Sequence, residues 1–348
     1  EHVHGHRAQA AVKVAREQVA HAIGARENEI IFTGSCTEAN NIAILGAARA
    51  QPEKKHLVTT AIEHPSVLEP CRQLEREGWS LTVLPVDELG MVSPEAVKAA
   101  LRADTLLVSV MAANNEVGTI QPIGEIGAIC EEAGVLFHAD LAQIMAHGPV
   151  DVIADHVHLA SLSGHKAYGP KGVGALYARS RSPRARLAPI QYGGGQEKGL
   201  RSGTLNVPLI VGMGEAISIA ARQGAADVAR LQAMSTAFRD YVAANLEGVT
   251  FNGHPVHRLA GNSSISIEGV EPLALMHKLN DTASFSASSA CSTEKVETSP
   301  VLLAMFGDTP RARQAFRVAP GRFTDKGALL DFARQLVAEV ETLRRFAA

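Results

Sequence analysis

Short apolar runs of strand length alternate with helical patterns through roughly the first 220 residues. Three of these runs, at 57–62, 135–139 and 156–162, predict buried strands. A helical pattern from about Ile210 to Leu246 then predicts a long helix that links this part to a smaller one. The pattern therefore predicts an α/β fold with a large domain at residues 1–222 and a small domain at residues 223–348.

The polar and glycine-rich stretch after the third run, Ser161–Gly174, reads SLSGHKAYGPKGVG. It turns the chain sharply, so that Lys166 emerges at the carboxyl end of the strand, where ligands bind in open α/β sheets. A lysine that attacks an aldehyde must be held there, partly desolvated and neutral. Lys166 is therefore a candidate Schiff-base residue, and the alternative is a surface lysine in a glycine-rich turn.

Two more polar side chains stand at the ends of predicted strands. Asp140 ends the run at 135–139, and His64 follows the run at 57–62 and precedes Pro65. Both positions are expected at the ligand-binding edge of the sheet. Asp140 could instead cap a helix, and His64 could be an ordinary structural histidine.

A candidate phosphate cradle lies at residues 30–38, where a strand, a small-residue turn and a helix start follow each other. Free amides and the positive dipole end at such a start bind phosphate well. Cys36 and Thr37 stand in this turn, and Cys36 is interpreted as a small packing residue whose amide matters. The alternative is that Thr37 only caps a helix beginning near Glu38.

These motifs together resemble the fold type I pyridoxal-phosphate enzymes, class V aminotransferase group, and within it the cysteine desulfurases. The resemblance covers nearly the whole chain. It implies a mostly parallel seven-stranded sheet flanked by helices in the large domain, and a smaller α+β domain at the carboxyl end. It also implies pyridoxal 5'-phosphate as the cofactor.

The resemblance implies that Lys166 forms the Schiff base, that Asp140 partners the pyridinium nitrogen, and that His64 stacks on the ring. A carboxylate at that nitrogen keeps it protonated, which makes the ring a better electron sink. The other implied cofactor contacts in this domain, to the phosphate or the ring oxygen, are Cys36, Thr37, Gln143, Ser163 and His165.

Two further family motifs concern the substrate and the partner subunit. Asn115, in NNEVG, is placed near the ring oxygen and the substrate carboxylate, and Thr204, in RSGT, is placed at the phosphate of the neighbouring subunit. The resemblance therefore implies a homodimer with shared sites. Arg317, in FRVAPGRF, is the candidate for bidentate binding of the substrate carboxylate, whereas Arg322 is interpreted as part of a surface salt bridge.

The small polar run Ser286–Thr293 surrounds a single cysteine, Cys291, and is similar to the mobile loop of the desulfurases. A thiolate on such a loop can attack the substrate sulfur and then swing out to deliver it. The family commonly has glycine where Ser288 lies. The remaining cysteines are interpreted as ordinary buried residues: Cys36, Cys71 and Cys130.

Composition excludes several other classes. The 348 residues are 46% hydrophobic, which is enough for a sizeable core, and the net charge of −3 argues against a broadly basic nucleic-acid-binding surface. No apolar run is long enough to span a bilayer, and four cysteines without a Cys-x-x-Cys pair fit a reducing cytoplasm. The amino-terminal histidines have a nonspecific spacing, so no metal is assigned. Family members begin with a further segment, which we expect to be missing, disordered or cleaved here.

The sequence therefore predicts a cytoplasmic, homodimeric cysteine desulfurase that forms a persulfide on Cys291 and releases alanine. Alternatives with the same cofactor are selenocysteine lysis and transamination, which needs no mobile thiol. A non-enzymatic alternative is a sulfur-relay scaffold, against which Lys166, Asp140 and His64 argue. A nicotinamide-binding domain ranks third, because no Gly-x-Gly-x-x-Gly follows the first strand.

The sulfur acceptor is expected to be a partner protein, without direct contact to nucleic acid. The loop at 286–300 is most similar to that of the desulfurase that supplies sulfur for phosphorothioate modification of bacterial DNA. The general desulfurases of iron-sulfur cluster assembly are close competitors.

Overall fold

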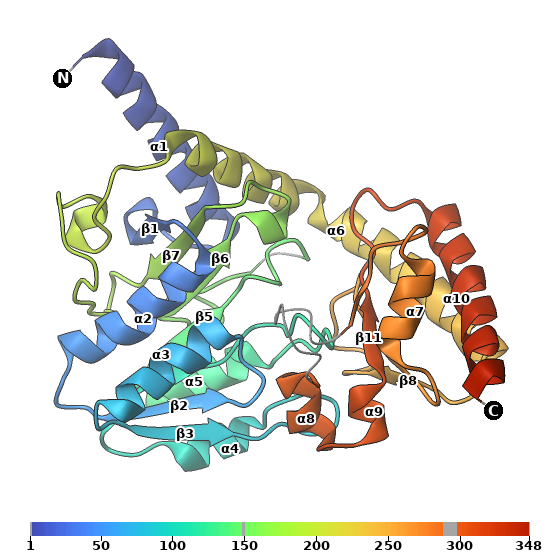
Figure 1. The fold of residues 1–348 in the computed structure, drawn as a ribbon. Helices are drawn as coiled ribbons and strands as arrows, with labels where there is room; N and C mark the ends of the chain where they lie inside the picture. Colours follow the sequence, from blue (N-terminus) through green and yellow to red (C-terminus); the bar gives the residue numbers. More distant parts are fainter. Residues whose placement is uncertain (1, 148–149, 288–297, 348) are drawn as a thin grey trace. The chain divides into compact units, whose positions relative to one another are not determined.

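The computed structural model describes residues 2–147, 150–287 and 298–347, which form two compact units (Figure 1). The first unit comprises residues 1–84, 92–113 and 121–224, and the second comprises 85–91, 114–120 and 225–348. The helix α6 (Val207–Asn245) contains the domain boundary predicted at residue 222 and agrees with the helical pattern that the sequence shows there.

The first unit contains a seven-stranded sheet in the order β1-β7-β6-β5-β4-β2-β3. Five strands run parallel to each other, namely β2, β3, β4, β5 and β6. The strand β7 is antiparallel to both of its neighbours, β1 and β6. The mostly parallel sheet predicted from the family resemblance is confirmed. The strands are β1 (Ile30–Thr33), β2 (His56–Thr60), β3 (Ser80–Leu84), β4 (Thr105–Ser109), β5 (Leu136–Asp140), β6 (Leu159–Ser163) and β7 (Gly174–Ala178).

The predicted strands are present with shifted ends. The run at 156–162 becomes a strand only at Leu159, because His156 has a φ of 53°, in the left-handed region. Every residue of β2, β4, β5 and β6 is buried, as expected for central parallel strands that are covered on both faces.

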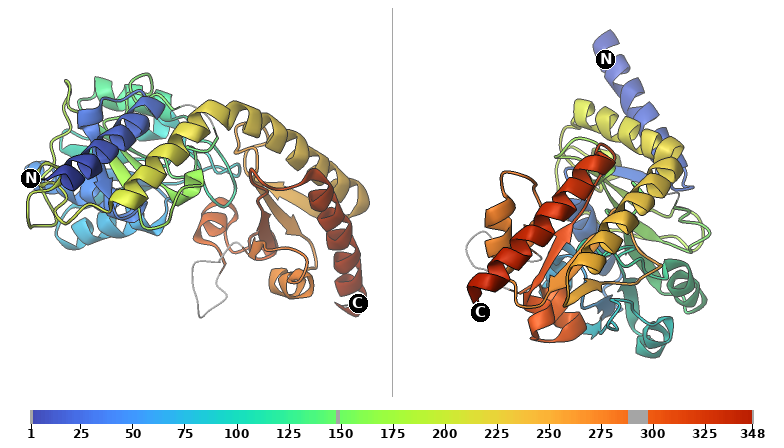
Figure 2. Two further views of the ribbon diagram at one scale, coloured as in Figure 1. Left: turned by 90° about the horizontal axis from the view of Figure 1, so that it is seen from above. Right: turned by 90° about the vertical axis from the view of Figure 1, so that its right-hand side faces the viewer.

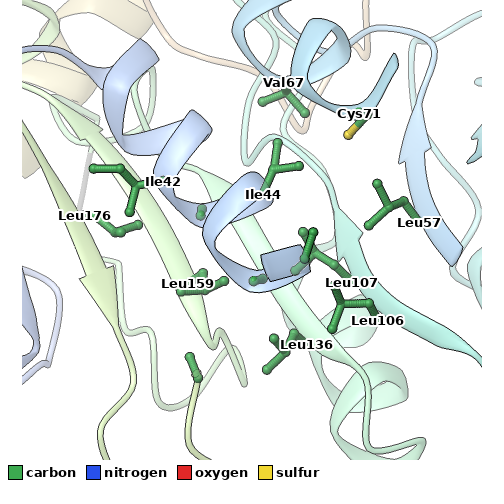
Figure 3. Close-up of a cluster of buried hydrophobic side chains, with 14 of the residues drawn as sticks. Ile42, Ile44, Leu57, Val67, Cys71, Leu106, Leu107, Leu136, Leu159 and Leu176 are labelled. Carbon is green, nitrogen blue, oxygen red and sulfur yellow. The ribbon is translucent and has the colours of Figure 1, made fainter. Parts of the chain in front are cut away.

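Helices of the first unit cover this sheet. They are α1 (Val3–Ala22), α2 (Cys36–Ala50), α3 (Pro65–Arg76), α4 (Pro94–Ala100) and α5 (Ile123–Glu132), with short 3-10 helices η1 (Glu27–Glu29), η2 (His165–Ala167) and η3 (Glu197–Gly199). Figure 3 shows an apolar cluster that joins α2 and α3 to the strands, with Ile42 and Ile44 from α2 and Leu176 from β7. Burial of this α2 face fixes the position of the helix start above the sheet.

The second unit contains an antiparallel sheet in the order β10-β11-β9-β8. Its apolar core includes Phe238 of α6 and Phe332 of α10, whose rings stack with centroids 6.2 Å apart. Figure 2 shows α10 and the second half of α6 in this unit. The elements are β8 (Val249–Asn252), β9 (Ser263–Ile267), α7 (Pro272–Leu279), β10 (Ser286–Ala287), α8 (Pro300–Phe306), α9 (Pro310–Arg313), β11 (Ala315–Val318) and α10 (Lys326–Ala347).

No helix among the described residues is long and apolar enough to cross a membrane. Within the same ranges, no three or more His, Cys, Asp or Glu side chains group as metal ligands would.

Candidate functional site

Polar side chains of the first unit gather where its parallel strands end. Asp140 is the last residue of β5, and Ser163 is the last residue of β6. His64 caps the amino end of α3 after β2, and Lys166 lies in η2 directly after β6. Since β2, β5 and β6 run in the same direction, these residues share one edge of the sheet.

Lys166 follows a tight turn after β6. A Cβ at Gly164 would lie 2.9 Å from Val173 Cγ1 and 3.1 Å from the carbonyl oxygen of Pro170, so the turn requires glycine there. The residue itself is exposed. The protein alone therefore does not provide the desolvation that the sequence analysis expected, and a bound group would have to contribute it.

Asp140 is 5% exposed and has three hydrogen-bond donors around it. The backbone N–H of Ala142 donates to Oδ1 at 2.9 Å, and the amide Nδ2 of Asn40 donates to Oδ2 at 2.9 Å. The thiol of Cys36 lies 3.7 Å from Oδ1. Burial and the charge of Asp140 raise the pKa of Cys36 well above its usual range, so the thiol is protonated and acts as a donor.

The charges of Asp140 and Lys166 both act on His64. Although the residue is exposed overall, its partial desolvation lowers the pKa of His64. Asp140 acts in the opposite direction, and Lys166 adds to the lowering. The imidazole is therefore neutral near pH 7, and its Nδ1 atom accepts from the backbone N–H of Ser66 at 3.1 Å.

The two predicted groups of phosphate ligands meet at one strand pair. Gly174 of β7 pairs with Ser163 of β6, and a Cβ at Gly174 would lie 2.7 Å from the backbone nitrogen of Cys36. The first amides of α2, at Cys36 and Thr37, therefore lie close to Ser163. The Ser163 hydroxyl is 3.2 Å from Nδ1 of His165. These groups form a small polar cradle at a helix amino terminus.

The α2 helix starts earlier than the sequence analysis expected. Its first residue is Cys36, and the side chain of Ser35 caps it by accepting from the N–H of Glu38 at 3.1 Å. The alternative in which Thr37 serves as the cap of a helix near Glu38 is therefore wrong. Serine at this position satisfies an N–H of the first turn, and Thr37 already lies inside the helix.

Gln143 and Thr204 lie elsewhere in the first unit. Gln143 is half-buried in the turn that follows β5. Thr204 is exposed and lines a cavity of about 780 Å³ together with residues of α1, among them Val12 and Arg16. Among the residues that line this cavity, none belongs to the group around Asp140.

The predicted substrate-binding residues lie in the second unit. Arg317 of β11 donates through Nη1 to the backbone oxygen of Asn115 and through Nη2 to the Ser286 hydroxyl at 3.1 Å. Asn262 also donates to the Asn115 oxygen, at 3.2 Å. Burial raises the pKa of the neighbouring Glu116 to about 7, although Arg317 acts in the opposite direction. The structure therefore brings Asn115 and Arg317 together.

Cys291 and Ser288 lie outside the described residues. Of the other cysteines, Cys71 and Cys130 are buried as predicted, and burial raises both of their pKa values to about 12. Cys36 is only half-buried, so the prediction of a buried cysteine is wrong at this position. Arg322 pairs with Asp227 at 2.6 Å, in line with the predicted salt bridge, although both side chains are largely buried.

Three polar residues at this site received no role in the sequence analysis. Asn40 and Ser66 lie on buried helix faces beside Asp140 and His64. Glu63 is 4% exposed, and its Oε1 accepts from the Thr60 hydroxyl at 2.7 Å and from the Met111 N–H at 2.9 Å. A polar residue on the apolar face of a helix, such as Asn40 on α2, is the signal that would have identified this group.

The amino-acid sequence is similar to one protein family and to curated members of it. Residues 1–306 match the family Aminotransferase class-V. A cysteine desulfurase IscS of Anaeromyxobacter sp. (strain Fw109-5) is 47% identical over 344 residues, which are 99% of this chain and 85% of the relative. A cysteine desulfurase of Homo sapiens is 44% identical over 344 residues, which are 99% of this chain and 75% of the relative.

Solved structures agree with this fold. A NifS-like protein superposes with a TM-score of 0.90 at 32% identity, covering 98% of this chain and 90% of that one. DndA from Streptomyces lividans superposes with a TM-score of 0.78 at 37% identity, covering 91% and 89%. SspA in complex with cysteine superposes with a TM-score of 0.80 at 34% identity, covering 93% and 90%.

Proposed function

Because the chain belongs to the class-V aminotransferase family, we propose that it is a cysteine desulfurase that converts L-cysteine to L-alanine. Relatives named cysteine desulfurase match 99% of the chain at 44% and 47% identity. The observation that carries the proposal is the group of Lys166, Asp140 and His64 at one edge of the parallel sheet.

Family membership implies pyridoxal 5'-phosphate as the cofactor, and the residues present fit this group. A buried carboxylate, an exposed lysine amine and a cradle of helix amides with a serine hydroxyl suit its ring nitrogen, aldehyde and phosphate. We assign the ring nitrogen to Asp140, the aldehyde to Lys166 and the stacking contact to His64. The phosphate is assigned to Cys36, Thr37, Ser163 and His165, with Thr204 reaching it from the partner subunit, and the ring oxygen to Gln143.

When bound, the cofactor withdraws electrons from the substrate and so stabilises negative charge at its Cα. Lys166 Nζ would remove the Cα proton and hold it for return to the cofactor carbon, and His64 would assist protonation of the groups that leave the substrate. The Cys291 thiolate attacks the substrate sulfur, so that a sulfur–sulfur bond forms, the carbon–sulfur bond breaks, and a persulfide remains on Cys291.

Arg317 is the proposed anchor of the substrate carboxylate, with Asn115 beside it. Guanidinium binds a carboxylate through two parallel hydrogen bonds. Arg317 now donates to the Asn115 oxygen and to Ser286, so binding of substrate would exchange these neutral acceptors for a charged one. A charge-assisted pair is the stronger contact, which favours the exchange.

One assay separates this function from its alternatives. Purified protein with pyridoxal phosphate is given cysteine or selenocysteine, and alanine, keto acid and elemental chalcogen products are measured. A cysteine desulfurase yields alanine from cysteine. Keto acid as the main product would indicate transamination, a strong preference for selenocysteine would indicate a lyase for that substrate, and turnover of neither would indicate a sulfur-relay scaffold.

We further propose that the enzyme works in the cytoplasm and passes sulfur to a partner protein. The sequence of the loop at 286–300 gives DNA phosphorothioation and iron-sulfur cluster assembly as the two candidate destinations. Deleting the gene in its host and testing genomic DNA for phosphorothioate linkages, with iron-sulfur enzymes assayed in parallel, distinguishes them. Intact phosphorothioation with failing iron-sulfur enzymes would exclude the DNA-modification role.

A further inference from the structure

A chain of buried polar groups connects Asp140 to His64 in the first unit. Asn40, on the inner face of α2, is 0% exposed, and its Nδ2 lies 2.9 Å from Asp140 Oδ2 and 2.8 Å from Ser66 Oγ. The Ser66 hydroxyl in turn lies 2.7 Å from His64 Nδ1. Two residues outside the proposed cofactor contacts therefore join the carboxylate to the imidazole.

The chemistry of these groups fixes where the protons lie. An amide nitrogen only donates, so Asn40 gives one proton to Asp140 and the other to Ser66 Oγ. The opposite orientation would place Asn40 Oδ1 against a carboxylate, which is repulsive. Among the described residues, Oδ1 has no hydrogen-bond partner and is buried, so the side chain is held through its nitrogen.

The same reasoning determines the tautomer of His64. The backbone N–H of Ser66 can only donate, so His64 Nδ1 carries no proton and accepts it at 3.1 Å. Because the Ser66 hydroxyl already accepts from Asn40, its own proton points to Nδ1 as well. The ring proton of neutral His64 therefore lies on Nε2.

We propose that Asn40 and Ser66 are positioning residues that hold the His64 proton on Nε2 and, through the same amide, orient the Asp140 carboxylate. Nε2–H is then the group through which neutral His64 donates a hydrogen bond, while Nδ1 is fixed against α3. The charged groups that act on His64 are Asp140 and Lys166, of opposite sign. The kinetic consequences rest on the proposed function, whereas the tautomer does not.

The test compares Asn40→Asp with Asn41→Asp, using full-length protein labelled with ¹⁵N-histidine, with and without pyridoxal phosphate. Both variants add one carboxyl group to α2, but Asn41 lies on the outer side of the helix, where its Nδ2 donates to the Thr37 oxygen at 2.9 Å. The His64 resonances are assigned by their loss in His64→Gln. In wild-type protein we expect a neutral ring with an unprotonated Nδ1.

In Asn40→Asp the Ser66 hydroxyl turns to the new carboxylate and stops donating to Nδ1. Two buried carboxyl groups in contact do not both ionise, so the new carboxyl and Asp140 share one proton and add no charge near His64. Loss of the hydroxyl donor to Nδ1 therefore raises the His64 pKa by itself, and Asn41→Asp leaves that pKa unchanged. For cysteine turnover we expect kcat to fall about tenfold in Asn40→Asp with its acid limb moved to higher pH, and KM to change less than about twofold.

A second pair keeps the test decisive if Asn40→Asp does not fold. Ser66→Ala removes a donor to Nδ1 and should raise the His64 pKa in the same direction, whereas Ser66→Thr retains the hydroxyl and should resemble wild type. A proton on Nδ1 in wild-type protein would overturn the proposal. So would a His64 titration in Asn40→Asp equal to that in Asn41→Asp, and neither result requires the protein to desulfurate cysteine.

Discussion

At the scale of single residues, burial decides which groups near Asp140 are charged. Burial raises the pKa of the Cys36 thiol well above its usual range and that of the Glu63 carboxyl to about 8. Both groups are therefore protonated near pH 7, and burial lowers the pKa of His64, so that it is neutral. A protonated thiol and a neutral imidazole next to one carboxylate suit a site that must attract a cationic ring nitrogen.

Lys166→Ala should abolish turnover and remove the visible absorption band of bound pyridoxal phosphate, because Lys166 is the proposed Schiff-base residue. The fold should remain, since the side chain is exposed. Lys171→Ala is the matched control, because Lys171 is also exposed and lies in the same glycine-rich stretch. An unchanged spectrum of dialysed Lys166→Ala protein would refute the assignment.

Glu63→Gln should remove a pH dependence of stability. An unfolded glutamate titrates near pH 4.5, whereas folded Glu63 titrates at about 8. Between these values the folded state binds a proton that the unfolded state has lost, so stability falls as pH rises, by up to about 1.4 kcal/mol per pH unit for this group. The fall begins near pH 4.5 and ends near pH 8.

Urea denaturation between pH 5 and 7.5 measures this effect as the difference in free energy of unfolding between wild type and Glu63→Gln. As pH rises, the free energy of unfolding of wild-type protein should fall relative to that of Glu63→Gln. Glu69→Gln, on the exposed face of α3, should show no such trend. Parallel pH profiles for wild-type and Glu63→Gln protein would show that Glu63 is ionised in the fold.

The sequence identifies some of these residues because their positions follow from strand ends. Asp140, His64 and Lys166 each follow an apolar run, and parallel strands bring such ends to one edge. Asn40 and Ser66 are different, because their importance depends on which residue faces which across two helices. That pairing is set by packing of α2 and α3 and is not encoded in local spacing.

At the scale of elements, β7 and the start of α2 touch through Gly174. A Cβ there would lie 2.5 Å from the carbonyl carbon of Ser35 and 2.7 Å from the nitrogen of Cys36, both backbone atoms that cannot turn aside. The proposed phosphate cradle therefore depends on a glycine in a strand. The sequence predicted the cradle from the turn at 30–38. The contribution of β7 could not be predicted, because it depends on the antiparallel pairing of β6 and β7, which local sequence does not specify.

Gly174→Ala should displace the α2 start, lower stability by about 1–3 kcal/mol and weaken pyridoxal phosphate binding. Denaturant unfolding and cofactor titration measure the two effects. Gly5→Ala serves as the control, because its Cβ would have no heavy atom closer than 3.6 Å and alanine favours a helix. Cofactor affinity equal to that of wild type in Gly174→Ala would remove the α2 start from the phosphate site.

At the scale of the whole molecule, we propose that the cofactor site is shared between two subunits. Thr204 is exposed and lines a cavity beside α1, as a residue that reaches a partner subunit could. Composition predicted that the chain forms a large core, and the family resemblance implied the sheet. The dimer cannot follow from hydrophobic periodicity, because a pattern of buried positions does not say which exposed residues another chain covers.

Mixing Thr204→Ala with Lys166→Ala protein after reversible dissociation tests the shared site. Each mixed dimer then has one site with both Lys166 and the partner's threonine intact. Random pairing should restore about one quarter of wild-type activity, because half of the dimers are mixed and each has one complete site. Activity that only equals the mean of the two separate variants, in a protein that sediments as a monomer, would exclude the dimer.

The most direct measurement of the central claim uses ³⁵S-labelled cysteine with the cofactor-loaded protein in a single turnover. We predict alanine and protein-bound label in equal amounts, with the label on the peptide that contains Cys291. Cys291→Ser should still bind pyridoxal phosphate and cysteine, since the proposed contacts are made by other residues, yet carry no labelled persulfide. Normal alanine yield with label on Cys36, Cys71 or Cys130, or no alanine at all, would contradict the account.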